Sequence, residues 1–569
     1  MQTDHRSGRT LETWQRALRI AIDGAPADLL LRDGRVINVF TGEIEKANVA
    51  IADGRIVGVG DFASAQQVVD LAGAIVAPSF IDGHIHTESS LLWITQFARA
   101  IVPHGAGAVV TDPHEIVNVA GLAGFDALVQ ASRDLPLGVH FTVPSCVPAS
   151  RRESAGAEMT AELIAHALAD PASVGLGEMM NFPGVIGGDP DIFAKLSVAR
   201  GRRKDGHAPG VRGRALDAYA LSGMTSDHES TELDEGREKL RRGFMLMIRE
   251  GSTEHNLREL LPLVNDLTWA RCCFASDDRD CATLLRDGHM NATLRMAVDS
   301  GLDPIRAIRM ATFNVADYWG LEQVGALAPG YWANLVILDD LASFDVRQVY
   351  FQGRRVASNG VAEFDVRTHI PDALLNTVHI AQLSSASLRL APENARRAVG
   401  VVDGQIVTRL LEVEPSVSGG EAVVDLERDL LKLVCVERHR ASGNVGVGYI
   451  KGFGLNRGAI ASSIAHDAHN IVAIGTSDAD ILAAIEAVVA MQGGLAAVSD
   501  GETLALLPLP VAGILSDRPL EETALTYEHM ERVAHELGSP LHSPFGLLAF
   551  MALSVIPEAR VTDQGFITL

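Results

Sequence analysis

The sequence has 569 residues, of which 47% are hydrophobic and 21% are charged, and its formal net charge is -24. This length exceeds that of one ordinary domain, and the composition is typical of a soluble globular protein. The acidic excess disfavours nucleic acid and anionic membranes as partners, because neutralising phosphate groups requires a surplus of Lys and Arg.

The chain offers no sign of secretion or of membrane insertion. Its five cysteines form no CxxC pair and do not suggest a disulfide scaffold. The first ten residues lack the apolar core of a signal peptide, and the apolar run from Gly546 to Ile556 is too short to span a bilayer. We therefore expect a cytoplasmic protein.

In chain order, the sequence begins with an N-terminal segment, 1–27, in which Leu11 to Asp23 predict an amphipathic helix. Short β runs with Asp-Gly turns follow over 28–76, and β runs return over 325–367. Two β segments on either side of a long middle region predict a small β-sandwich formed from both segments, with another domain inserted between them.

The middle region, 77–324, alternates strand-like runs with helical patterns, which predicts an α/β fold of the (β/α)8 TIM-barrel type. The final region, 368–569, mixes strand and helix signals and predicts an additional C-terminal α/β domain. The eight strand-like runs of the middle region are IVAPSFIDGHIH, AGAVVTDPHE, GVHFTVPSCVP, SVGLGEMMNF, RRKDGHA, GMTSDHE, FMLMIREG and RCCFASDDR.

Histidines and acids stand at the ends of several predicted barrel strands, where catalytic residues of such barrels gather. His84 and His86 are two residues apart in an extended run, so both imidazoles face the same side. An isolated HxH pair is often an ordinary surface pair, but several such groups converging at one barrel mouth are a more specific signal. The candidate ligands are His84, His86, Glu178, His207, His228 and Asp277.

Six ligands are too many for one tetrahedral site and suit two cations that share a bridging carboxylate, for which Glu178 is the natural candidate, and a solvent hydroxide. Imidazole and carboxylate without thiolate suit Mn, Fe or Zn, and ligand chemistry does not choose among them.

Long motifs around these residues resemble the adenine deaminases, a branch of the amidohydrolase superfamily. They include PSFIDGHIHTESS (78–90), HGAGAVVTDPHEIVNV (104–119), GLGEMMNFPGVIGGD (175–189), FASDDR (274–279) and GFGLNRGAIASSIAHDAHNIVAIGTSD (452–478). The resemblance covers about Asp28 to Leu569. It implies an amidohydrolase-type barrel with a binuclear Mn2+ or Fe2+ site, Zn2+ being possible, built from the six ligands above.

The resemblance further implies hydrolysis of adenine to hypoxanthine and ammonia. Glu178 stands where many amidohydrolases carry a carbamylated lysine, which separates this branch from hydantoinases and dihydroorotases. Two other functions remain open from the sequence: deamination of another 6-substituted purine, and hydrolysis of a cyclic amide. A non-catalytic binding protein is disfavoured by the complete ligand set.

In the mechanism that we expect, Asp277 acts as general base and then general acid, with Glu178 and His228 also at the reacting centre. The purine ring must accept a proton at N1, so a neutral acid or a polarised donor has to lie nearby. The candidates for substrate binding or proton transfer are Glu88, His114, Glu115, Glu250 and Asp278. Each has a structural alternative, such as helix capping by Glu88 or pairing of Glu250 with a nearby arginine.

A second histidine cluster, His466-Asp467-Ala468-His469, lies in the C-terminal region. It suggests either an additional metal or lid site or, as the simpler interpretation, a hydrogen-bonded structural cluster. The partners expected from the sequence are a small-molecule substrate, adenine, and a second copy of the chain in a homodimer.

Overall fold

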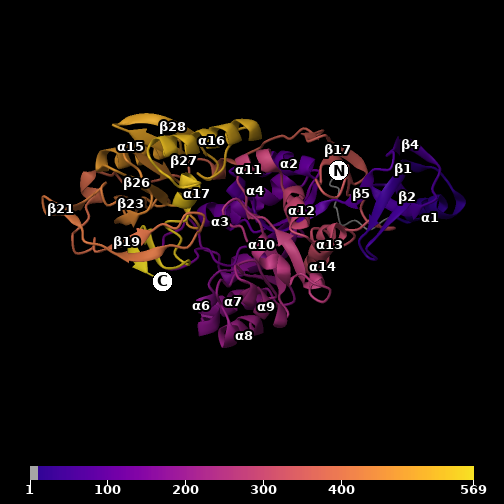
Figure 1. The fold of residues 1–569 in the computed structure, drawn as a ribbon, viewed down its shortest axis with the longest axis horizontal. Coiled ribbons are helices and arrows are strands. Elements are labelled where there is room, and N and C mark those ends of the chain that lie inside the picture. The colour runs from indigo at the N-terminus through magenta and orange to yellow at the C-terminus, as the bar shows by residue number, and fades with distance from the viewer. Residues whose placement is uncertain (1–9, 569) are drawn as a thin grey trace.

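A computed structural model describes residues 10–568. Residues 1–9, which begin the predicted segment 1–27, lie outside the described residues. The expectation that the chain has no signal peptide also concerns this stretch. The central barrel-like region lies between a β-rich region and a C-terminal α/β region (Figure 1). From residue 10 to residue 568, no helix is long and apolar enough to cross a membrane.

The β-rich region is formed by two distant chain segments, as predicted. Antiparallel pairing of β5 with β15, in which Pro78 is opposite Leu335, joins them. In the described part of the chain they make one nine-stranded hydrogen-bonded sheet around a shared apolar core. Its strands are β1 (Ala27–Asn38), β2 (Glu43–Ala52), β3 (Arg55–Gly60), β4 (Ala65–Asp70), β5 (Ile75–Pro78), β15 (Leu335–Leu338), β16 (Val346–Phe351), β17 (Arg354–Ser358) and β18 (Val361–Ala362).

Helix α1 (Leu11–Asp23) precedes this sheet and confirms the predicted N-terminal helix. Thr10 caps its first turn by accepting a hydrogen bond from Thr13 N (3.3 Å), and Gly24 ends it in the left-handed conformation (φ 70°).

Each of the eight runs predicted for the middle region contains a parallel strand. Strands β6 to β10 pair in chain order, strands β11 to β13 form a second parallel set, and β14 returns to pair with β6. Thr225 N donates to Lys204 O (3.4 Å) between the two sets. The strands are β6 (Phe80–His86), β7 (Ala106–Thr111), β8 (Gly138–Val143), β9 (Ser173–Met179), β10 (Arg203–Gly206), β11 (Ser226–Asp227), β12 (Met245–Arg249), β13 (Cys272–Ala275) and β14 (Asp277–Asp278).

Helices alternate with these strands, so the order is the one that an amidohydrolase-type barrel requires. The α-helices are α2 (Ile94–Ile101), α3 (His114–Ala120), α4 (Leu122–Ser132), α5 (Ala161–Ala167), α6 (Phe182–Gly187), α7 (Pro190–Val198), α8 (Gly213–Leu221), α9 (Leu233–Arg241), α10 (Leu257–Leu260), α11 (Cys281–Asp287), α12 (Met290–Asp299), α13 (Pro304–Met310) and α14 (Phe313–Trp319). Short 3-10 turns are η1 (Thr87–Ser90), η2 (Val102–His104), η3 (Leu261–Leu263) and η4 (Trp269–Arg271).

The C-terminal region is built on a mixed sheet in the order β20-β19-β24-β23-β26-β25-β27-β28, and helix α15 packs on β25, β26 and β27. Helix α16 contacts α2 and α11 of the central region. The elements are η5 (Asp372–Leu374), η6 (Ser385–Leu388), β19 (Arg397–Gly400), β20 (Arg409–Glu412), β21 (Ser416–Ser418), β22 (Glu421–Val423), β23 (Leu430–Val436), β24 (Val445–Lys451), β25 (Ala459–Ser462), β26 (Ile471–Gly475), α15 (Asp478–Ala490), β27 (Gly494–Ser499), β28 (Glu502–Pro508), α16 (Leu520–Glu536), α17 (Pro544–Ala549), β29 (Ala559–Thr562) and β30 (Gly565–Thr568).

Candidate active site

The six predicted ligands meet at the carboxyl ends of the parallel strands. All of them are buried. Two lie on β6, one on β9 and one on β14, and two follow directly after β10 and β11. They are His84, His86, Glu178, Asp277, His207 and His228, respectively.

The two histidines of β6 turn the same ring atom toward a common point. His84 Nε2 lies 3.2 Å from His86 Nε2. The Nδ1 atom of His86 donates to the backbone oxygen of Asp112 (2.8 Å), and Nδ1 of His84 pairs with Asp205 Oδ2 (2.7 Å). These contacts occupy both Nδ1 atoms, so the Nε2 atoms are the ones available to a metal ion.

Asp277 completes this group. Its Oδ1 lies 3.5 Å from His84 Nε2 and 3.3 Å from His86 Nε2, while Arg249 donates to its Oδ2 (2.6 Å). Burial opposes ionisation of this carboxyl, but Arg249 and the neighbouring histidines hold the pKa of Asp277 well below its usual range. Asp277 is therefore a carboxylate at neutral pH.

Glu178 divides its two oxygens between two sets of histidines. Oε1 lies 3.1 Å from His86 Nε2, whereas Oε2 lies 2.5 Å from His207 Nδ1 and 3.2 Å from His228 Nε2. The position of its backbone is fixed because Glu178 N donates to Asp112 Oδ2 (2.7 Å). A carboxylate with one oxygen toward each set has the shape of a bridging ligand.

This donor set fits divalent cations. Among residues 10–568, neither ring nitrogen of His228 has a hydrogen-bond partner, although the side chain is only 1% exposed. Buried polar atoms without partners are rare, and a cation would satisfy Nε2. Burial would lower the pKa of His84, but Asp205 and Asp277 outweigh it and raise the pKa to about 10. The cluster of candidate ligands thus favours positive charge. A cation supplies that charge, whereas protonation of both His84 and His86 at Nε2 would bring two N–H groups face to face.

A buried ion pair lies behind the second set of histidines. Lys239 on α9 donates to Asp227 Oδ2 (2.7 Å) and to the backbone oxygen of Ala208 (2.8 Å), and Asp227 Oδ1 accepts from Ala208 N (3.1 Å). Ala208 follows His207, and Asp227 precedes His228. Lys239 therefore positions both histidine-bearing loops.

We expect Lys239→Met to lower the free energy of unfolding by about 3–5 kcal/mol, because it leaves the buried carboxylates of Asp227 and Glu235 without their cation. Burial would raise the pKa of Asp227, but Lys239 holds it below its usual value. The stabilisation is therefore fully present above the unfolded pKa of 3.8 and is lost as the pH falls through the lower folded pKa. Urea unfolding followed by circular dichroism at several pH values measures both effects.

The matched control is Arg237→Met on the same helix. Arg237 pairs with Asp234 on the surface, where both side chains are exposed, and such pairs contribute at most about 1 kcal/mol. A loss for Lys239→Met no larger than that for the control would contradict the positioning role of Lys239.

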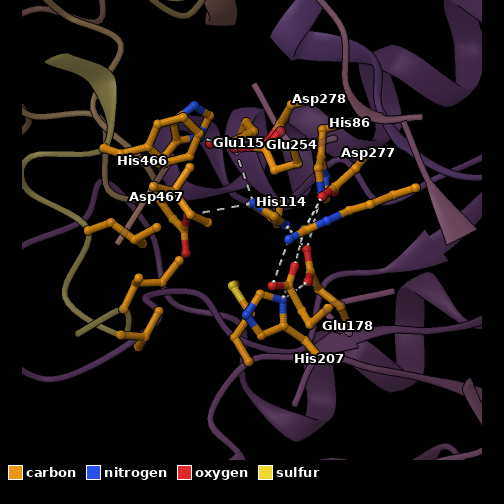
Figure 2. Close-up of a pocket in the computed structure, with 18 residues that line it drawn as sticks. His86, His114, Glu115, Glu178, His207, Glu254, Asp277, Asp278, His466 and Asp467 are labelled. Carbon is orange, nitrogen blue, oxygen red and sulfur yellow. Dashed lines mark hydrogen bonds and ion pairs between the residues drawn. The ribbon is translucent and has the colours of Figure 1, made fainter. Parts of the chain in front are cut away.

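The C-terminal region forms one wall of the active-site pocket, which the sequence suggested only through the alternative interpretation of the His466–His469 cluster as a lid site. His466 and Asp467 lie opposite Glu178, Asp277 and His207, as Figure 2 shows. The apolar part of this wall comes from five side chains: Ile406, Phe550, Leu553, Val555 and Ile556.

Three of the five candidates, His114, Glu115 and Asp278, line the pocket, and His114 Nδ1 lies 3.3 Å from Glu178 Oε1. Asp278 accepts a hydrogen bond from Ser89 Oγ, and burial together with Asp277 raises its pKa. Burial would raise the pKa of Glu115, but His466, His469 and His114 hold it well below its usual range. Glu115 is therefore an acceptor and is not a neutral acid.

The other two candidates do not reach the pocket. Glu88 accepts hydrogen bonds from Ile116 N and Thr87 Oγ1 (both 3.2 Å), although burial and Glu115 raise its pKa to about 7. Glu250 accepts from His255 Nδ1 (2.7 Å) and Leu257 N (3.2 Å) instead of the expected arginine. Both carboxylates are held by local contacts that turn them away from the site.

Sequence reasoning missed Glu254, a pocket acid four residues beyond Glu250. One of its oxygens, Oε2, has no hydrogen-bond partner within the described range. Burial, together with Asp278, raises the pKa of Glu254 to about 8, so this acid carries a proton at neutral pH. Glu229 was also missed; it pairs with Arg249, which in turn holds Asp277. The available signal was their position near strand ends: Glu229 is the last residue of the predicted run GMTSDHE, and Glu254 lies three residues after the run FMLMIREG.

Comparisons with known proteins agree with this geometry. Residues 75–356 match the amidohydrolase family, which implies a divalent metal centre at this cluster, and residues 405–569 match the adenine deaminase C-terminal domain. An adenine deaminase of Dehalococcoides mccartyi is 49% identical over 97% of this chain and 96% of that protein, and adenine deaminase 2 of Carboxydothermus hydrogenoformans is 44% identical over 97% of each. The chain belongs to the adenine deaminase family.

Among solved structures, L-hydantoinase from Arthrobacter aurescens is 15% identical, with a TM-score of 0.45, over 60% of this chain and 98% of that one.

Proposed function

We propose that the chain hydrolyses adenine to hypoxanthine and ammonia, using His84, His86, Glu178, His207, His228 and Asp277 to hold two divalent cations. The observation that carries this proposal is the division of the Glu178 oxygens between two sets of histidine nitrogens beside Asp277. The choice of adenine as substrate rests on the two relatives described above. Each is an adenine deaminase, and this chain matches nearly the whole length of each.

Mn2+ or Fe2+, with Zn2+ as an alternative, suits these nitrogen and oxygen donors. Bound cations supply Lewis acidity, which brings the pKa of water from about 15.7 toward neutrality. Glu178 would bridge the two cations, while the buried Arg249 and Asp205 fix the positions of Asp277 and His84 through hydrogen bonds.

Asp277 is the proposed proton carrier. Its ionised carboxylate takes a proton from the attacking water and delivers it to the amino nitrogen on C6 as ammonia departs. His228 Nε2 lies 3.2 Å from Glu178 Oε2, the oxygen that does not face His86. His228 therefore completes the second set of donors.

Protonation of the ring at N1 requires an acid that keeps its proton in the pocket. Glu254 meets this requirement, because it lines the pocket, its pKa is raised to about 8 and one of its oxygens has no protein partner in the described structure. Asp278, whose pKa is also raised, lines the same pocket. Glu88 and Glu250, turned away by their own contacts, do not. We therefore assign ring protonation to the Glu254 and Asp278 pair.

The test is ammonia release by protein purified with Mn2+ supplied, using a panel of adenine, N6-methyladenine, isoguanine and cyclic amides. We expect release from adenine, loss of activity after chelation, and recovery when two equivalents of Mn2+ are returned. Absence of ammonia from adenine at every metal loading would overturn the proposal. Release from a cyclic amide alone would move the chain to the hydantoinase type of reaction.

Three further predictions accompany this proposal. The first is the domain division: segment 1–27, a small sandwich from 28–76 and 325–367, the catalytic barrel 77–324 and the C-terminal domain 368–569. The paired segments and the strand order described above support it. The second and third, a cytoplasmic location and a homodimer without nucleic-acid or membrane partners, rest on the sequence alone.

A further inference from the structure

The two histidines of the loop that carries His466 and Asp467 share one carboxylate of the barrel. Glu115 on α3 accepts hydrogen bonds from His466 Nδ1 (2.5 Å) through Oε1 and from His469 Nε2 through Oε2. The ring of His466 also stacks on Phe550, with 4.5 Å between the centroids. The loop therefore has a defined position over the pocket.

Glu115, His466 and His469 are close enough to hold a cation, but their hydrogen-bond pattern favours a clamp without one. Nδ1 of His469 accepts from Ala465 N (3.3 Å), so the ring hydrogen lies on Nε2 and points at Glu115. Burial and the nearby charges lower the pKa of His469 to about 4, which keeps the ring neutral with one hydrogen. An Nε2 that carries this hydrogen has no lone pair for a metal.

Asp467, held between these two histidines, has an acceptor atom that the protein does not use. The residue is 3% exposed and lines the pocket, and its Oδ2 has no hydrogen-bond partner among residues 10–568. Its Oδ1 lies 3.8 Å from His114 Nε2, and His114 lies between Asp467 and the candidate ligands (Figure 2). A buried acceptor without a donor is costly, so a donor on a bound ligand would be recognised strongly.

We propose that Asp467 is a specificity-determining residue that accepts the N–H of the five-membered ring of a free purine base. This inference rests on the proposed function. The amino group at C6 must face the ligand cluster of the barrel, which places the five-membered ring toward the opposite wall, where Asp467 and the apolar side chains of the C-terminal region lie. A base substituted at N9, such as a nucleoside, lacks this N–H and adds bulk at the wall.

Purine chemistry fits the remainder of this wall. Apolar side chains such as Phe550 and Leu553 cover the flat ring faces, while a few polar groups fix the orientation. Sites built around a buried hydrogen bond reject analogues that lack the donor more strongly than purely apolar pockets do. One carboxylate from a second domain is thus sufficient to separate the free base from its N9-substituted forms.

The experiment compares adenine with 9-methyladenine in the wild-type protein, Asp467→Ala and Asp467→Asn, each loaded with Mn2+. We expect Asp467→Ala to raise KM for adenine by about 10- to 100-fold with a smaller change in kcat, since a hydrogen bond to a charged group is lost. The ratio of kcat/KM between adenine and 9-methyladenine should fall by at least about 10-fold. Asp467→Asn keeps an acceptor oxygen and should restore most of this ratio.

Calorimetric binding of hypoxanthine and 9-methylhypoxanthine supplies a second readout that does not depend on turnover, and it should show the same loss of discrimination. The matched control is Asp563→Asn, because Asp563 accepts from Ser154 N (3.0 Å) at the contact between the same two regions but does not line the pocket. We expect this control to leave the ratio unchanged.

An unchanged ratio in Asp467→Ala, or an equal loss for both substrates, would overturn the inference while leaving the deaminase proposal intact. A wild-type protein that releases no ammonia from adenine would instead contradict the proposed function. The two failures are therefore distinguishable.

Discussion

Asp277→Asn should lower kcat for adenine deamination by about 10^2- to 10^4-fold while most of the bound metal remains. The amide keeps an oxygen near the Nε2 atoms of His84 and His86, so the cation position loses one charge and not its shape. The amide cannot accept and return a proton, and general acid-base catalysis contributes rate factors of this size. Ammonia release and metal analysis of the same preparation measure both quantities.

The control for this variant is Asp266→Asn, which removes one charge from a side chain that is 91% exposed and pairs with Arg306 on the surface. Its activity should match that of the parent protein. Near-normal turnover in Asp277→Asn would remove Asp277 from the proton-carrying role.

Glu178→Gln should lower the metal content from two equivalents to about one or fewer and abolish measurable deamination. Each Glu178 oxygen faces a different set of histidine nitrogens, so an amide can keep an acceptor toward only one set. The NH2 group then faces one cation position, where its hydrogens repel a cation and compete for the imidazole lone pairs that would bind it. Elemental analysis after gel filtration, together with ammonia release, checks the result.

Glu486→Gln, at an exposed position of α15, is the matched control and should keep both metal equivalents. Two tightly bound equivalents in Glu178→Gln, with activity preserved, would contradict the bridging assignment.

The barrel strands could be predicted because short apolar runs that end in polar residues are a local property of the sequence. The alternation in β6 places His84 and His86 on one face without reference to the remainder of the chain. Strand ends also located the acids on β9 and β14, since parallel strands bring their carboxyl ends to the same edge.

The direction of single side chains beyond the strand ends could not be predicted. Glu250 and Glu254 stand four residues apart after β12, yet hydrogen bonds to His255 and Leu257 turn Glu250 away while Glu254 enters the pocket. These contacts depend on the fold of the loop between β12 and α10, which no periodic pattern encodes.

The role of His466 and His469 could be predicted only in part. A hydrogen-bonded cluster was the favoured interpretation, and the structure confirms hydrogen bonds from both histidines. The acceptor, Glu115, lies 351 residues before His466 in the sequence. A contact over that separation is determined by how the two regions pack, so the place of Asp467 in the pocket could not be predicted from a local pattern.

The clamp between Glu115 and the C-terminal loop has a consequence for redesign. The proposed cation ligands all belong to the strands and loops between residues 84 and 277, whereas the opposite wall is lined by Ile406, His466, Asp467 and side chains between 550 and 556. The two halves of the pocket can therefore be varied separately. Libraries confined to the wall segments, with Glu115, His466 and His469 retained as the anchor, offer a route to enzymes that accept larger heterocycles with the hydrolytic centre left untouched.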